Sequence, residues 1–106
     1  MTRAGHTKRD RCDVYVGRPS KWGNPFILAG TRTKFVGLVV TSPDPLGDYE
    51  RYVRAAPMLR AELPSLRGKV LGCWCVRATD PIPAKREDER CHAQVLARLV
   101  EEVVGG

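Results

Sequence analysis

The sequence lacks long apolar runs. Its longest, such as residues 36–40, comprise only a few residues, whereas a membrane-spanning helix needs about 20 apolar residues. The basic residues at the N-terminus are not followed by an apolar segment either, so we expect no secretory signal. The sequence also contains no internal repeat and no low-complexity segment. We therefore expect a soluble, cytoplasmic protein without a membrane partner.

Acidic residues are scarce in the first part of the chain. Residues 1–40 contain eight Lys and Arg and two acidic residues, whereas residues 41–106 contain ten of each. The net charge of +6 therefore comes entirely from the first 40 residues. An anionic partner such as a nucleotide, a nucleic acid or a phosphate would meet this part of the chain first. For residues 3–11, a solvated basic tail is an equally good interpretation.

The length of 106 residues and an ordinary globular composition, with 42% hydrophobic and 28% charged residues, predict one domain with a single modest core. We place this domain at residues 14–106 and expect residues 1–13 to form a basic, flexible segment. Strands interleaved with helices predict a small α/β or α+β domain. We favour the α/β class, with a small mixed sheet, flanking helices and a C-terminal amphipathic helix.

The order of apolar and turn-forming residues predicts the elements. Residues 14–16 and 69–75 are expected to form strands, and residues 26–28 and 34–40 a β-hairpin. Asp48 is the expected N-cap of a helix that Pro57 stops or kinks, and a second short helix follows. The clearest element is the last one, where the apolar residues share one helical face: Val95, Leu96, Leu99, Val100 and Val103.

Two loops with unusual chemistry leave predicted strands. The first covers residues 17–26 and the second runs from Cys73 to His92. If the strands at 14–16 and 69–75 are parallel neighbours, both loops open onto the same sheet edge, where α/β proteins favour ligand sites. We therefore predict a composite site at this edge.

The first loop has the composition of a binding loop. Its glycines allow a ligand to approach the backbone closely, its basic residues suit phosphate or carboxylate, and its amide can contact a base edge. Alternatively, the loop is an elaborate turn pinned by its aromatic residues, with its tryptophan in the core. The candidate ligand-binding residues are Gly17, Arg18, Lys21, Trp22, Gly23 and Asn24.

The second loop contains three cysteines and a histidine, and three interpretations of them compete. Zinc prefers these residue types, so Cys73, Cys75, Cys91 and His92 are a candidate zinc set. However, one residue between paired cysteines is fewer than usual, and adjacent helical residues diverge by about 100°. The catalytic interpretation makes Cys75, Cys91 and His92 a thiolate and proton-transfer group near a helix N-terminus. The structural interpretation places the cysteines in the core as small apolar residues, and Cys12 is incidental.

Three segments resemble a known family. They are VYVGRPSKWGNPF at residues 14–26, LRGKVLGCWC at residues 66–75 and CHAQVL at residues 91–96. Together with the middle segment at residues 48–75, they resemble the uncharacterised bacterial and phage family known as domain of unknown function 4326. The resemblance implies a location in the cytoplasm of a bacterium, or of a host cell for a phage protein, but no activity.

The chain departs from that family pattern in two places, and a further segment lies outside the pattern. The family more often has an acidic residue at the position of Gln94, so any role of a carboxylate there is weakened. The loop at residues 76–90 is longer than is typical, which suggests an insertion at the rim of the site. The basic N-terminus with His6 is not part of the pattern.

Three kinds of function fit these observations. The first is binding or processing of a nucleotide or nucleic-acid-related anion at the composite site, although the sequence lacks a paired-carboxylate catalytic set. The alternatives are a non-catalytic nucleic-acid-binding module with a structural zinc or cysteine core, whose binding would weaken with salt, and a protein-interaction factor.

Overall fold

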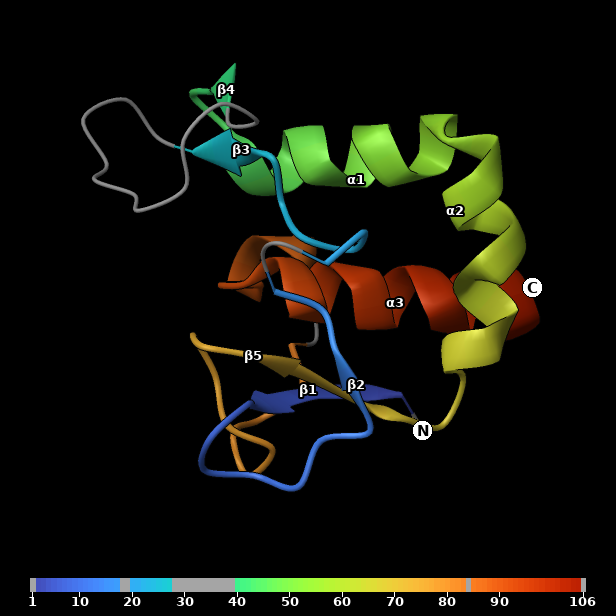
Figure 1. The fold of residues 1–106 in the computed structure, drawn as a ribbon. Coiled ribbons are helices and arrows are strands. Elements are labelled where there is room, and N and C mark those ends of the chain that lie inside the picture. Colours follow the sequence, from blue (N-terminus) through green and yellow to red (C-terminus); the bar gives the residue numbers. More distant parts are fainter. Residues whose placement is uncertain (1, 18–19, 28–39, 84, 106) are drawn as a thin grey trace.

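The computed structural model describes residues 2–17, 20–27, 40–83 and 85–105. Three strands form a parallel sheet in the order β1–β5–β2. They are β1 (Arg3–His6), β2 (Val14–Tyr15) and β5 (Val70–Cys73), so the central strand is the last of the three in sequence. Figure 1 shows this sheet as one layer, with the helices stacked on one side of it.

Two helices follow one another across a proline. Helix α1 (Pro45–Ala55) ends before Pro57, which begins α2 (Pro57–Glu62). This break confirms the prediction, because proline lacks the N–H that an interior helical residue donates. A 3-10 turn η1 (Leu63–Leu66) then leads towards β5.

The predicted N-cap of α1 is wrong by one turn. Asp44, and not Asp48, caps the helix, and its carboxylate accepts a hydrogen bond from the Gly47 N–H at 3.2 Å. Asp48 lies within the first turn, where a negative charge also favours the helix dipole. Proline at the first helical position moves the start of the helix upstream of the predicted position.

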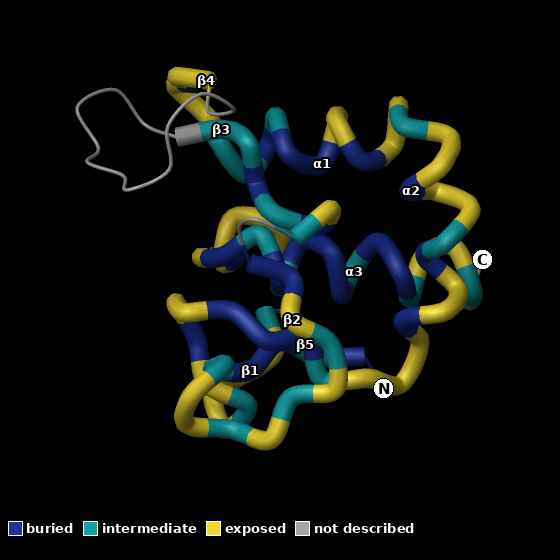
Figure 2. Tube along the Cα trace, in the orientation of Figure 1, coloured by how far each residue is buried: buried dark blue, intermediate teal, exposed yellow. Residues whose placement is uncertain are grey.

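Helix α3 (His92–Gly105) lies between the sheet and α1 (Figure 1). The short 3-10 turn η2 (Arg86–Asp88) precedes it. Figure 2 shows α3 as the most deeply buried helix, in agreement with its packing against elements on both sides. The amphipathic C-terminal helix is confirmed, and its fully buried residues are Ala93, Val95, Leu96, Leu99 and Val100.

The N-terminal residues belong to the domain. We expected residues 1–13 to be a flexible segment, but β1 pairs with the central strand in the register Arg3↔Val70 to His6↔Cys73. Ala4 is buried, and a Cβ added at Gly5 would lie 2.8 Å from Val70 Cγ1. The prediction of a separate segment is therefore wrong for β1, because this strand supplies the pairing partner on one side of β5.

The predicted β-hairpin is also wrong. β3 (Phe26–Ile27) and β4 (Val40–Thr41) pair in parallel, with Phe26 opposite Val40. A hairpin turn joins antiparallel strands, so these two segments cannot form one. The remainder of the predicted hairpin, residues 28–39, lies outside the described residues.

The α/β class is confirmed. Every strand pair within the described part of the chain is parallel. In the same part of the chain, no helix has the length and apolar character that crossing a membrane requires.

Candidate functional site

The carboxyl ends of β1, β5 and β2 meet at one edge of the sheet. The register places His6 beside Cys73 and Tyr15 beside Gly72. β2 and β5 are parallel neighbours, as the sequence predicted, so the loops after them leave from the same edge. The N-terminus of α3 lies against this edge, because His92 contacts the backbone just after β2.

His92 is held in a defined orientation. Its Nε2 lies 2.7 Å from the carbonyl oxygen of Val16, which can only accept, so Nε2 carries the proton. In the neutral ring, Nδ1 then holds the lone pair, and it faces the Cys91 Sγ at 3.8 Å. The ring of Tyr49 packs edge-on against the imidazole, with the centroids 5.3 Å apart. The histidine is therefore anchored at one nitrogen and presents the other to a thiol.

Three cysteines meet beside it, and we call Cys73, Cys75 and Cys91 the thiol cluster. The buried Cys73 interacts through hydrogen bonds with the thiols of Cys75 and Cys91 and with the backbone N–H groups of Cys75 and Val76. These donors outweigh burial and hold the pKa of Cys73 far below its ordinary value. The pKa of Cys91 is raised, first by its interactions with the other two thiols and then by burial.

A metal site finds no geometric support in this cluster. Among the described residues, no group of three or more His, Cys, Asp or Glu side chains is arranged to hold a metal ion. Zinc at Cys73, Cys75, Cys91 and His92 therefore stays a prediction, and no step below depends on it.

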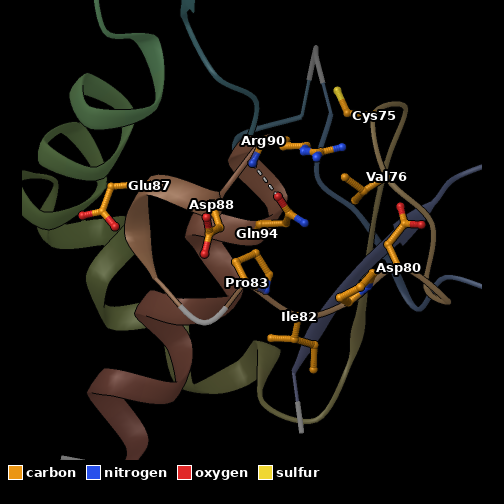
Figure 3. Close-up of a pocket in the computed structure, with 10 residues that line it drawn as sticks. Cys75, Val76, Asp80, Ile82, Pro83, Glu87, Asp88, Arg90 and Gln94 are labelled. Atoms are coloured by element: carbon orange, nitrogen blue, oxygen red, sulfur yellow. Dashed lines mark hydrogen bonds between the residues drawn. The ribbon is translucent and has the colours of Figure 1, made fainter.

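A cavity of about 610 Å³ opens beside the exposed Cys75. The loop after β5 and the start of α3 form its walls (Figure 3). In Figure 3 the side chain of Arg90 extends towards Cys75. Gln94 Oε1 accepts a hydrogen bond from the Arg90 N–H at 2.6 Å. A carboxylate at position 94 would accept the same bond.

An exposed aromatic group lies at the same edge, and the sequence analysis missed it. The Trp74 indole N–H donates to the Tyr15 hydroxyl at 3.2 Å, and the His6 ring lies edge-on to the indole at 5.7 Å. Lys8 Nζ lies 5.5 Å from the centre of the Trp74 ring. We call Trp74, Tyr15, His6 and Lys8 the Trp74 platform. The sequence signal for this group was an indole between two cysteines at the end of a predicted strand. The contribution of His6 and Lys8 could not be predicted, because it depends on the pairing of β1, which the sequence did not indicate.

Two residues of the predicted binding loop are buried and form hydrogen bonds within the domain. Trp22 is buried, and its carbonyl accepts a hydrogen bond from the Tyr49 hydroxyl at 2.7 Å. Asn24 is buried too, with its Nδ2 donating to the Pro45 carbonyl and its Oδ1 accepting from the Phe26 N–H. These contacts support the structural interpretation of the loop, and ligand binding by Trp22 and Asn24 stays a prediction.

The other predicted loop residues lie nearer the surface or on a turn. Lys21 forms an ion pair with Glu62 at 2.5 Å. Gly17 and Gly23 belong to two successive turns, in which the Ser20 N–H bonds to Gly17 and the Gly23 N–H bonds to Ser20, both at 2.9 Å. A Cβ at Gly17 would lie 2.5 Å from the Tyr15 hydroxyl oxygen, so a larger residue at this position would displace the Tyr15 side chain. Arg18 lies outside the described residues.

Comparisons with known proteins agree with the resemblance seen in the sequence. The uncharacterized protein R718 of Acanthamoeba polyphaga mimivirus is 29% identical to this chain over 112 residues, which cover 93% of this chain and 77% of the relative. No solved structure matches. The family described as "Domain of unknown function (DUF4326)" matches residues 1–102, a span that includes β1, the Trp74 platform and the thiol cluster. The chain therefore belongs to the DUF4326 family.

Proposed function

We propose that the protein binds a ligand in which an aromatic base is joined to a phosphate, as in a nucleotide or a single-stranded nucleic acid. The observation that carries this proposal is the Trp74 platform. Trp74 follows the central strand directly and is 52% exposed, although its indole N–H is already paired. An oriented, exposed indole offers a face for base stacking, which contributes about 1–3 kcal/mol per base.

The charge around the platform suits the phosphate. Lys8 lies over the indole ring, and a stacked base would take its place there while the ammonium pairs with the phosphate. Arg9 and Arg11 are exposed on the segment that follows β1. Arg77 approaches the same segment, donating to the Arg9 carbonyl at 3.3 Å. A ligand with a negative charge next to its base is complementary to this surface.

The position of the platform also favours a ligand site. It lies at the carboxyl ends of parallel strands, where ligands bind in α/β sheets. In the sequence, Val16 and Gly17 follow β2. Cys75 is adjacent to Trp74 in the chain, so a bound base would lie beside the thiol cluster.

Calorimetric titration with adenosine monophosphate and with a short oligodeoxythymidine tests this function. We expect at least one probe to bind, and Trp74→Ala to weaken binding about tenfold or more. Trp74→Phe, which keeps an aromatic face, should restore most of the affinity. Lys8→Gln should weaken binding and reduce the salt slope by about 1.

Tyr52→Ala is the matched control, because Tyr52 is an exposed aromatic residue on α1. It should leave binding unchanged. Tighter binding of the oligonucleotide with a steep salt dependence would identify a nucleic-acid ligand, and equal binding of both probes a nucleotide. No binding of either probe, or an equal loss with Trp74→Ala and Tyr52→Ala, would overturn the proposal.

A further inference from the structure

The three sulfurs of the thiol cluster differ in their access to solvent. Cys73 and Cys91 are 1% and 2% exposed, whereas Cys75 is exposed and lines the cavity of about 610 Å³. A dissolved reagent can therefore reach only Cys75 directly. The two buried sulfurs can react only with a group that Cys75 has already taken up.

The buried sulfurs lie within reach of that exposed one. Cys73 interacts through hydrogen bonds with Cys75 and with Cys91, and Cys91 also interacts with Cys75. Cys73 receives two backbone N–H groups in addition, which stabilise a negative sulfur at the end of β5. Cys91 faces the lone pair of the anchored His92 instead. The sulfur best prepared to attack Cys75 is that of Cys73.

The cavity at Cys75 carries charges of both signs. Arg90 extends towards the thiol (Figure 3), and Asp80, Glu87 and Asp88 line the remaining wall. A guanidinium that lines the cavity attracts a carboxylate. A ligand that carries both a carboxylate and an ammonium group therefore fits this wall better than an uncharged one.

We propose that Cys75 is a thiol–disulfide exchange site that takes a small amino-acid-type disulfide in this cavity, and that Cys73 resolves the product. Cys75 gives up its proton to water and attacks one sulfur of the disulfide, which forms a mixed disulfide and releases one thiolate. The Cys73 thiolate then attacks the Cys75 sulfur and releases the second thiolate, and both released thiolates take up protons from water. The small disulfide is reduced to two thiols, and the two cysteines are oxidised to one disulfide.

Exposure of the purified chain to glutathione disulfide, followed by tryptic mass mapping, tests this assignment. Cys73 and Cys75 lie in one tryptic peptide, residues 70–77, whereas Cys91 lies in residues 91–98. We expect the peptide of residues 70–77 to lose two hydrogen atoms without becoming linked to another peptide. Cys73→Ser should instead accumulate the glutathione adduct on Cys75, and Cys12→Ser, the matched control, should behave as the unchanged chain.

The charge of the cavity is tested separately with uncharged 2-hydroxyethyl disulfide. Arg90→Gln should lower the exchange rate with glutathione disulfide about threefold or more relative to the uncharged reagent. A larger loss of rate with glutathione disulfide than with the uncharged disulfide would show that Arg90 attracts the ligand. An equal loss with both reagents would show a general change in the reactivity of Cys75.

Three results would overturn the proposal. A cross-link between residues 70–77 and 91–98 would assign the resolving role to Cys91. A first adduct on Cys12, or no adduct at all, would remove the site from Cys75. Stoichiometric metal in the purified protein, with all thiols of the cluster shielded from the reagent, would do the same. The tryptic mass map of the unchanged chain shows which cysteines form the disulfide even if Cys73→Ser does not fold.

Discussion

At the scale of single residues, Glu50 on α1 is a buried charge that is paired with several arginines. Its carboxylate accepts hydrogen bonds from Arg98 at 2.5 Å and from Arg54 at 3.0 Å. Arg98 also bonds to the buried Glu89 at 2.9 Å. Burial alone would raise the pKa of Glu50, but the hydrogen bonds from Arg98 and Arg54 hold this pKa below its ordinary value. The residue therefore joins α1 to α3 as a carboxylate.

Replacing this carboxylate should reveal that ionic contribution. We expect Glu50→Gln to lower the free energy of unfolding by about 2 kcal/mol at pH 7, since hydrogen bonds to charged groups contribute about 1.5–3 kcal/mol. Because the pKa of Glu50 is lower in the folded state, its carboxylate stabilises the fold fully at pH values above the unfolded-state pKa of about 4.3. This stabilisation is lost as the pH falls through the folded-state pKa. Urea denaturation at several pH values should show the difference from the unchanged chain shrinking below about pH 4. A difference that stays constant with pH would contradict this assignment.

Single residues also show how far the sequence could predict the site. Cys91 and His92 were recognisable because reactive residue types stand together before a clear helix. The anchoring of His92 on Val16 could not be predicted from the sequence, because it depends on a backbone carbonyl 76 positions away. Asn24 has a side chain suited to contact a ligand, yet its amide forms hydrogen bonds with the backbone of Pro45 and Phe26. Residue type therefore identified the chemistry, while exposure and hydrogen-bond partners decided which residues remain open to a ligand.

At the scale of elements, the start of α1 depends on Asp44. Its carboxylate caps the Gly47 N–H, and Ser42 supports the turn by accepting from the Asp44 N–H at 3.0 Å. We expect Asp44→Ala to lower the free energy of unfolding by about 1 kcal/mol, the usual contribution of an N-cap. Asp44→Asn, which keeps a capping oxygen, should recover most of this loss. Thermal unfolding of both variants and of the unchanged chain measures the effect. If Asp44→Ala were as stable as the unchanged chain, Asp44 would not be the cap.

Elements were predictable where the pattern was long and failed where it was short. The apolar face of α3 extends over several turns, so the sequence identified it. β1 consists of Arg-Ala-Gly-His, which contains no Val, Ile, Thr, Phe, Tyr or Trp, and only its pairing with β5 makes it a strand. β3 and β4 have two residues each, and such short apolar segments do not reveal whether their partner runs parallel or antiparallel.

At the scale of the molecule, the central position of β5 explains why distant segments form one site. β5 pairs with β1 on one side and with β2 on the other, so chain segments from both ends of the sequence meet at its carboxyl end. One face of this sheet packs against α3, and the turns after β1 and β5 approach the other face, where Gly5 lies close to Ala78. The Trp74 platform and the thiol cluster consequently depend on the whole sheet.

Removing β1 should therefore unfold more than the N-terminus. Deletion of residues 2–6 removes the β1–β5 pairing, the buried Ala4, and the bonds from Thr2 to Glu101 at 2.8 Å and from Gly68 to Thr2 at 2.9 Å. We expect a loss of about 5 kcal/mol or more, which approaches the whole stability of a small domain. Urea denaturation followed by circular dichroism should then lack a cooperative transition. A free β5 edge should also make the shortened chain prone to association.

A charge-only variant separates the strand from its basic neighbours. Replacing the exposed Lys8, Arg9 and Arg11 by glutamine removes positive charge from the N-terminal region and keeps β1. Its urea midpoint should match that of the unchanged chain, because exposed charges contribute little to stability. If the deletion also kept this midpoint, residues 2–6 would be the flexible segment that their composition suggests. If only the deletion loses the transition, the N-terminal strand is part of the fold that positions the site.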